Sequence, residues 1–260
     1  MRITYRSKSN YEYWRDRWVD IESDDAMTND NYYPLKYSNM VIKNKDEKIL
    51  EAGCGGGRIL RYYHDKNYKI KGIDFIEEAI GKLKKVDPSL DVEYGTILNL
   101  QFENDYFDVV LAFGLFHNFQ SEDLNKSLSE TFRVLKTGGK LCASFRSDNI
   151  QELIVDLIKG GGQVNSKEKI FHKLNLKKNE FKELIKKNGF RINNIFSVQN
   201  MPFLYKFSFF RSLDHKKFNE NKGRIEGYKL SIFGNFIQKC LMRFFPDSFC
   251  NIYLILAEKE

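Results

Sequence analysis

The chain has 260 residues, enough to bury one substantial core, and its composition shows no break that would divide it into two domains. Apolar residues make up 42% of the chain, and the longest nearly unbroken apolar stretch, residues 109–116, is far shorter than the roughly 20 residues that a bilayer span requires. The first residues are mostly polar and charged, unlike a secretory signal. We therefore expect a cytoplasmic protein without a transmembrane helix.

The formal charge of +7 attracts anions, but the lysines are spread along the chain where helical faces would meet water. We interpret most of them as a solvated surface. The four cysteines are scattered without C-x-x-C spacing, and the four histidines are isolated from them. The sequence therefore predicts neither a disulfide framework nor a bound metal.

Residues 1–40 form a leader rich in aromatic side chains, with a Tyr-x-Tyr-Trp-x-x-x-Trp pattern from Tyr11 to Trp18. Aromatic rings that face water forgo the free energy of apolar burial, so we expect these residues to pack on something. Two interpretations stay open: a lid that excludes water over a ligand, or a helical extension docked on the sheet. Residues 41–260 are expected to form the main domain.

From Lys48 onward, short apolar runs alternate with amphipathic stretches of helical period, which is typical of a parallel sheet with helices on both faces. Glycines after two of the predicted helices, Gly138–Gly139 and Gly189, are expected to end them, since glycine adopts the left-handed backbone of a C-terminal cap. The predicted strands are 48–52, 69–74, 91–94, 107–113, 140–145, 190–198 and 251–258, and the predicted helices are 76–86, 121–135 and 179–188.

Residues 199–249 form an insert before the last predicted strand and mix aromatic with basic residues, as in 201–211 and 236–245. The simplest interpretation is extra core for a large lid. Three functional interpretations stay open beside it: an apolar pocket for a substrate, interfacial contact with a membrane, and aromatic stacking on single-stranded RNA.

The most informative segment is the glycine-rich turn after the first predicted strand, which reads Gly53-Cys54-Gly55-Gly56-Gly57. Glycines permit positive φ and let a ligand approach the backbone without meeting a Cβ atom. Asp74 follows about 20 residues later, at the end of the second predicted strand, where a carboxylate commonly accepts hydrogen bonds from both hydroxyls of a ribose. Together these features predict an adenosine-type site at the carboxyl edge of the sheet.

Spacing distinguishes between the adenosine ligands. The dinucleotide fingerprint G-x-G-x-x-G, counted from Gly53 and Gly55, requires a third small residue at the position that Arg58 occupies. A large cation there would spoil the close helix packing of that motif. The phosphate-binding pattern G-x-x-x-x-G-K-S/T is also absent. NAD and ATP are therefore disfavoured.

The turn resembles the first motif of the class I S-adenosylmethionine-dependent methyltransferases, which is an acid, any residue and then G-x-G-x-G. Further segments are similar to later motifs of that family in the same order, over about 150 residues. The resemblance implies S-adenosylmethionine as cofactor and a Rossmann-like α/β fold. Its seven-stranded sheet would be mostly parallel, with an antiparallel last strand and helices on both faces. The matching positions are Glu51, Gly53, Gly55, Gly57, Asp74, 107–112, 135–141 and 188–190.

Carried over by position, the resemblance implies that the glycine turn lines the methionine part of the cofactor and that Glu51 orients this turn or binds the cofactor amine. Asp74 would hold the ribose, and the turn at residues 95–98 would border the adenine. Many relatives have an acid where this chain has Thr96. The end of the fourth strand would flank the amino-acid end. The residues assigned to the cofactor are Glu51, Gly53, Cys54, Gly55, Gly57, Asp74, Phe75, Thr96, Ile97, Leu98, Ala112 and Phe113.

His117 follows the fourth predicted strand, where the fold would face the transferred methyl group. Histidine titrates near neutral pH, which suits a general base. The alternative is a capping or structural histidine, because the sulfonium is already a strong electrophile and many relatives use no dedicated base.

The resemblance implies methyl transfer to oxygen or nitrogen of a small molecule, a sugar or a lipid precursor. A non-catalytic S-adenosylmethionine-binding or assembly subunit and an RNA methyltransferase are the alternatives. No N-P-P-Y-like motif follows the fourth strand, where Ala112-Phe113-Gly114-Leu115 stands, so a nucleic-acid partner is not expected. The sequence does not indicate the acceptor or the oligomeric state.

Overall fold

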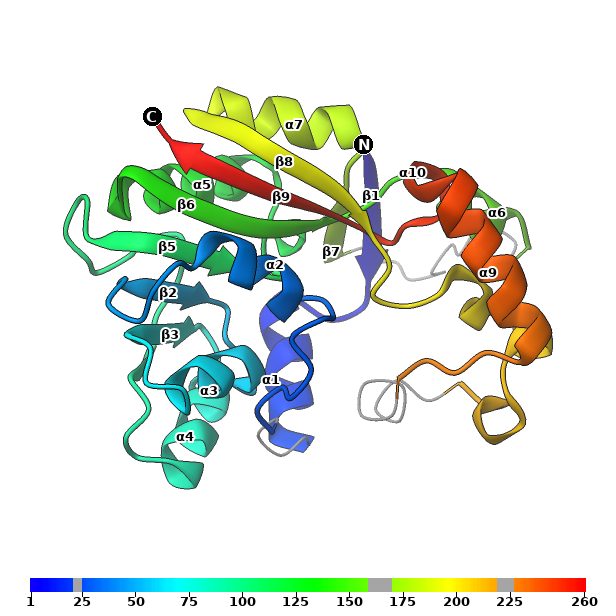
Figure 1. The fold of residues 1–260 in the computed structure, drawn as a ribbon, viewed down its shortest axis with the longest axis horizontal. Helices are drawn as coiled ribbons and strands as arrows, with labels where there is room; N and C mark the ends of the chain where they lie inside the picture. Colours follow the sequence, from blue (N-terminus) through cyan, green and yellow to red (C-terminus); the bar gives the residue numbers. More distant parts are fainter. Residues whose placement is uncertain (21–24, 159–169, 219–226) are drawn as a thin grey trace.

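The computed structural model describes residues 1–20, 25–158, 170–218 and 227–260. Its centre is a seven-stranded sheet in the order β4-β3-β2-β5-β6-β9-β8 (Figure 1). β9 is antiparallel to both of its neighbours, whereas the other pairs are parallel. All the predicted strands are present, and the predicted sheet with its antiparallel last strand is confirmed. The strands are β2 (Ile49–Ala52), β3 (Ile70–Asp74), β4 (Val92–Tyr94), β5 (Phe107–Ala112), β6 (Leu135–Arg146), β8 (Phe190–Val198) and β9 (Ile252–Lys259).

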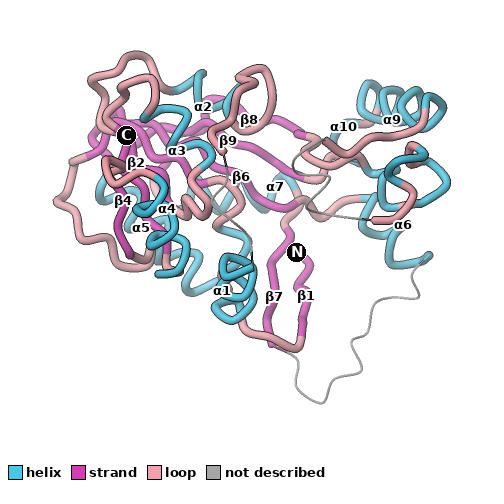
Figure 2. Tube along the Cα trace, turned by 90° about the horizontal axis from the view of Figure 1, so that it is seen from below, coloured by secondary structure: helices cyan, strands magenta, loops and turns pink. Residues whose placement is uncertain are grey.

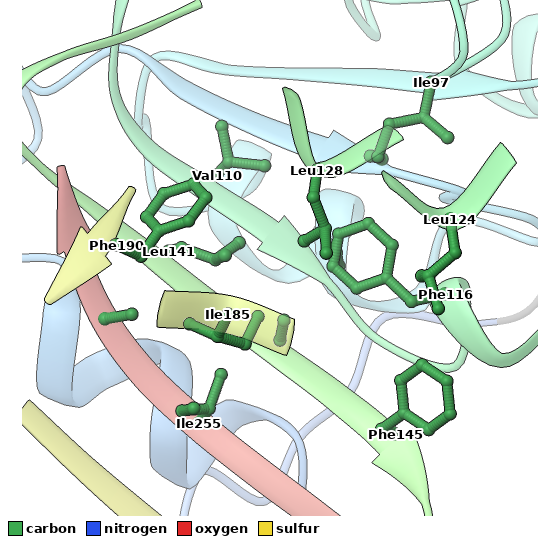
Figure 3. Close-up of a cluster of buried hydrophobic side chains, with 14 of the residues drawn as sticks. Ile97, Val110, Phe116, Leu124, Leu128, Leu141, Phe145, Ile185, Phe190 and Ile255 are labelled. Carbon is green, nitrogen blue, oxygen red and sulfur yellow. The ribbon is translucent and has the colours of Figure 1, made fainter. Parts of the chain in front are cut away.

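Helices cover both faces of this sheet, because successive side chains of a strand point to opposite sides. α5 and α7 pack on one face, and α2, α3 and α4 pack on the other. Figure 3 shows Leu124 and Leu128 of α5 and Ile185 of α7 gathered with Val110 and Leu141 of the sheet. The helices are α1 (Asn10–Asp20), α2 (Leu35–Val41), α3 (Arg58–His64), α4 (Glu77–Val86), α5 (Ser121–Val134), α6 (Ile150–Ile158), α7 (Lys178–Lys187), α9 (Ile232–Phe244) and α10 (Pro246–Phe249).

The beginning of the chain forms a second, two-stranded sheet that the sequence did not predict. β1 (Arg2–Arg6) pairs antiparallel with β7 (Ile170–Asn175). β7 in turn is fastened to the end of β6, since the Leu176 N–H donates to the Arg146 carbonyl at 3.1 Å. The leader is therefore attached to a segment that lies far away in the sequence.

The insert forms a small lobe with a core of its own. Phe203, Leu204, Tyr205 and Leu230 are buried there, together with apolar residues of α6 and α9. Figures 1 and 2 both show α6, α9 and α10 side by side at one end of the molecule, beyond the sheet. None of the helices in the described ranges combines the length and the apolar character that a membrane crossing requires.

The helix that begins at Ser121 ends earlier than predicted. α5 stops at Val134, and Leu135 is already extended and pairs with Phe107. Gly138 has a φ of +76°, but it lies within β6, where the register against β5 shifts, and not at the helix end. The prediction that Gly138 and Gly139 cap this helix was wrong, because pairing with β5 takes up Leu135 first.

Candidate functional site

The turn between β2 and α3 uses a backbone that glycine adopts at little cost. Gly53, Gly55 and Gly57 have φ angles of +73°, +53° and +79°. The N–H groups of Gly53 and Cys54 both donate to the Ile73 carbonyl, at 2.8 and 3.0 Å. The turn is therefore fastened to β3 and lies at the carboxyl ends of two parallel strands, where ligands bind in open α/β sheets.

Asp74, the last residue of β3, contacts this turn directly. Its Oδ2 accepts from the Gly55 N–H at 2.9 Å, and its Oδ1 accepts from the Ile76 N–H at 3.0 Å. The residue is 6% exposed, and this burial raises the pKa of its carboxyl group, although the N–H donors oppose the shift. Each oxygen keeps a second lone pair, so an ionised Asp74 can still accept two hydroxyl groups of a ribose.

Helix α1 forms a wall of the site. A Cβ atom on Gly55 would lie 2.5 Å from Cζ2 of Trp18, so the indole lies directly on the glycine turn. Trp14 stacks on Trp18 with ring centroids 6.5 Å apart, and Tyr11 meets Phe75 edge-on at 6.1 Å. The aromatic leader therefore covers the turn and the residue that follows the acidic end of β3.

Both ends of α1 are anchored. Asn10 donates from Nδ2 to the Asn118 carbonyl at 2.7 Å, beyond the end of β5. Lys82 of α4 donates from Nζ to the Val19 carbonyl at 2.9 Å. The helix thus spans from the β5 side of the sheet edge to the α4 side.

Glu51 and Cys54 flank the first glycine of the turn, and both are buried. A Cβ atom on Gly72 of β3 would lie 3.1 Å from the Cys54 sulfur. Burial, together with the Asp74 and Glu51 carboxylates, raises the pKa of the Cys54 thiol well above its ordinary value. Cys54 is therefore a packing residue and not a nucleophile.

The turn after β4 contains Thr96, Ile97 and Leu98, which the sequence analysis assigned to the cofactor beside its adenine. The Thr96 hydroxyl accepts from the Leu98 N–H at 3.2 Å, and the Gly95 N–H donates to the Asp74 carbonyl at 3.0 Å. Ile97 lies in the buried cluster of Figure 3. Thr96 is exposed and Leu98 half-buried, so these two, and not the Ile97 side chain, can border an adenine.

The end of β5 is tied to residues that the sequence analysis missed. Ala112 is fully buried, and Phe113 meets Tyr33 edge-on at 5.7 Å. Ser144 accepts from the Gly114 N–H at 2.9 Å and shares a hydrogen bond of 3.0 Å with the Tyr33 hydroxyl. No motif marks Tyr33 or Ser144, because their contact depends on strand order and not on spacing.

His117 lies just beyond, in a short 3-10 turn, and is 7% exposed. Its Nδ1 is buried and has no hydrogen-bond partner in the part of the chain that the structure describes. Burial, with the positive charges of Arg146 and Lys173, holds the pKa of His117 well below its usual range. The imidazole is therefore neutral at pH 7 and can accept a proton only as a weak base.

The predicted residues thus fall into three groups along one sheet edge: the turn with Asp74 and Phe75, the Thr96 turn, and the end of β5 with His117. Across the described ranges, no group of three or more His, Cys, Asp or Glu side chains is arranged to hold a metal ion.

A family model described as a methyltransferase domain matches residues 50–143. That segment contains the glycine turn, Asp74 and the end of β5. Residues 50–143 thus match a methyltransferase domain. S-adenosylmethionine is the cofactor that this family implies, and the buried carboxylate of Asp74, which keeps a second lone pair on each oxygen, fits the hydroxyls of its ribose.

Curated relatives resemble the methyltransferase domain over part of their length. An uncharacterised methyltransferase of Schizosaccharomyces pombe is 33% identical over 99 residues, which are 38% of each chain. A ubiquinone biosynthesis O-methyltransferase of Pseudomonas entomophila is 24% identical over 162 residues, 60% of this chain and 69% of that protein. The chain spans between 38% and 51% of the length of the first relatives that it matches.

Solved structures extend the likeness in fold. A methyltransferase from Methanosarcina mazei has a TM-score of 0.58 at 19% identity and covers 87% of this chain and 97% of its own. The 4+2 cyclase SpnF has a TM-score of 0.59 at 14% identity and covers 99% of both chains. At such identities the likeness shows the fold alone.

Replacing Gly55 by alanine tests the packing of α1 on the turn. The new Cβ atom would have to tolerate a φ of +53° and a distance of 2.5 Å to Trp18. We expect Gly55→Ala to lower the free energy of unfolding by about 1–3 kcal/mol, measured by urea denaturation.

Gly81→Ala is the matched control, because a Cβ atom on this α4 residue would meet no atom within 4 Å. Helix propensity predicts that this variant gains up to about 1 kcal/mol. Equal stability of the two variants would contradict the contact between Trp18 and the turn.

Proposed function

We propose that the protein is an S-adenosylmethionine-dependent methyltransferase. The observation that carries the proposal is the hydrogen bond of 2.9 Å from the Gly55 N–H to Asp74, which joins the two halves of the expected cofactor site in one buried place. The methyltransferase domain at residues 50–143 includes both halves.

Bound S-adenosylmethionine would supply a methyl group on an electrophilic sulfonium. The residues of this chain then have positioning tasks. Asp74 would accept the ribose hydroxyls, and Trp18 with α1 would exclude water from the glycine turn. His117 is the residue that we propose to take a proton where the acceptor releases one.

We infer that the acceptor is an oxygen or nitrogen atom of a small molecule, a sugar or a lipid precursor. The similarity to a ubiquinone biosynthesis O-methyltransferase supports an acceptor of this size and kind. The competing function is a protein that binds S-adenosylmethionine without transferring its methyl group. We retain this second function because SpnF, which is a cyclase, shares this fold over 99% of the chain, so the fold alone does not imply methyl transfer.

A methyl-transfer assay separates these functions. The protein is incubated with S-adenosylmethionine labelled in its methyl group and with cell extract separated into small-molecule, lipid, RNA and protein fractions. We expect a small-molecule or lipid component to gain the label and the mass of one methyl group in place of one hydrogen. Asp74→Asn should lower the rate at least about tenfold, because it weakens hydrogen bonds to a charged acceptor.

Asp46→Asn is the control for this assay, since the Asp46 side chain is 88% exposed and pairs with Lys69 on the surface. Its rate should match that of the unmodified chain. Label in RNA would support the RNA alternative. Tight binding of the cofactor with no label in any fraction would contradict catalysis.

We also infer that α9 gives this protein a reversible contact with an anionic membrane. Ile232 and Phe236 are 93% and 66% exposed and lie one turn apart. Lys239 and Arg243, both exposed, continue the same outward stripe. An apolar and basic face of this kind suits the boundary between lipid headgroups and acyl chains, with the cations facing the lipid phosphates.

A vesicle sedimentation assay tests this contact. The unmodified chain should bind phosphatidylcholine vesicles that contain phosphatidylglycerol, and bind vesicles of phosphatidylcholine alone less well. Ile232→Ser with Phe236→Ser should reduce binding at least about tenfold, because each buried side chain contributes about 1.5–3 kcal/mol. Val86→Ser with Tyr94→Ser, which removes exposed apolar residues elsewhere, is the control. Equal loss in both variants would rule out a role for α9.

A further inference from the structure

Basic side chains gather beside the carboxyl end of β6, at the same sheet edge as the glycine turn. Arg146 is the last residue of β6. Lys173 lies on β7, which is bonded to the end of β6 through Leu176. Arg6 comes from β1, which pairs with β7. Three elements that lie far apart in the sequence thus place Lys173 between Arg146 and Arg6, and Lys173 interacts electrostatically with both cations.

Among the residues that the structure describes, these cations have fewer partners than charged groups usually have when they leave bulk water. In the described part of the chain, the side chains of Arg146 and Lys173 form no hydrogen bond and no ion pair. Arg6 lies over the ring of Tyr13 at 4.0 Å and donates from Nη2 to Asn10. Its Nε and Nη1 atoms are buried, and neither has a hydrogen-bond partner within the described residues.

The electrostatic balance of this group is positive. The charged groups that act on Lys173 are Arg146, Glu152, Lys206 and Arg6. Glu152 of α6 is the acid in this set, and Lys206 already pairs with it at 2.8 Å. Burial, with the nearby cations, lowers the pKa of Lys173 to about 8. Within the described ranges, the group is therefore short of negative charge.

His117 connects the basic group to the end of β5. Its ring meets Phe145 of β6 edge-on at 6.3 Å. Arg146 and Lys173 both act on it electrostatically, and its buried Nδ1 atom has no partner in the described residues. The basic group therefore lies beside the place where the proposed function puts the acceptor, two strands away from β2 in the sheet order.

We propose that Arg6, Arg146 and Lys173 bind an anionic group, a carboxylate or a phosphate, of the methyl acceptor. The proposal rests on the function proposed above and narrows its acceptor to anionic molecules. An anion at this place offsets charges whose removal from water is costly. The arginine forks present parallel N–H donors that match two oxygens of a carboxylate or phosphate.

Calorimetric titration of inorganic phosphate and of acetate into the full chain tests the proposal, with and without saturating S-adenosylhomocysteine. We expect phosphate to bind the unmodified chain and to bind Arg146→Gln and Lys173→Met at least about tenfold more weakly. Acetate affinity equal to that of phosphate indicates a carboxylate on the acceptor, and weaker acetate binding indicates a phosphate. Lys84→Met, an exposed lysine of α4, is the control and should bind phosphate unchanged.

Lys173→Arg keeps the positive charge and should retain phosphate binding, which separates loss of charge from loss of fold. Equal phosphate affinity in the unmodified chain and in both neutralised variants would overturn the proposal. Variants that lose affinity for S-adenosylmethionine but keep their affinity for phosphate would also overturn the proposal, because the cations would then bind the cofactor. Failure of the unmodified chain to bind S-adenosylmethionine, with phosphate binding still dependent on Lys173, would reject the proposed function and leave the anion site.

Discussion

The hydrogen bond from the Gly55 amide to the Asp74 carboxylate joins the ends of two parallel strands, and the rest of the site is arranged around it. A carboxylate with so little exposure stays ionised only if donors compensate the lost water. Gly55 and Ile76 provide such donors from the backbone. The glycine turn therefore stabilises the acid that we propose to bind the ribose of the cofactor.

The leader extends this arrangement beyond the sheet. Trp18 lies on the turn where a larger residue than glycine would collide, and β1 attaches the start of the leader to β7. β7 carries Lys173 to the end of β6, next to Arg146. The same segment that covers the glycine turn thus also helps to build the proposed acceptor side, so the proposal links water exclusion and acceptor binding in one structural unit.

Local patterns were sufficient to predict the sheet and the meeting of the glycine turn with Asp74. Runs such as residues 109–112 are apolar because both faces of a central parallel strand are buried. The glycines of the turn indicate a left-handed backbone that other residues rarely adopt. Pairings between distant segments were not predictable. Nothing in the sequence near Ile3 indicates that it lies opposite Leu174. The helical spacing of apolar residues continues through Leu135, but this residue is extended because it pairs with Phe107 of β5.

The central claim is that the Gly55 and Asp74 contact marks a site for a sulfonium nucleoside. Isothermal titration of the unmodified chain with S-adenosylmethionine, S-adenosylhomocysteine and NAD tests it most directly. The account predicts that the first two bind at one site per chain and that NAD does not bind. Absence of binding by either adenosyl compound, or equal binding of NAD, would contradict it.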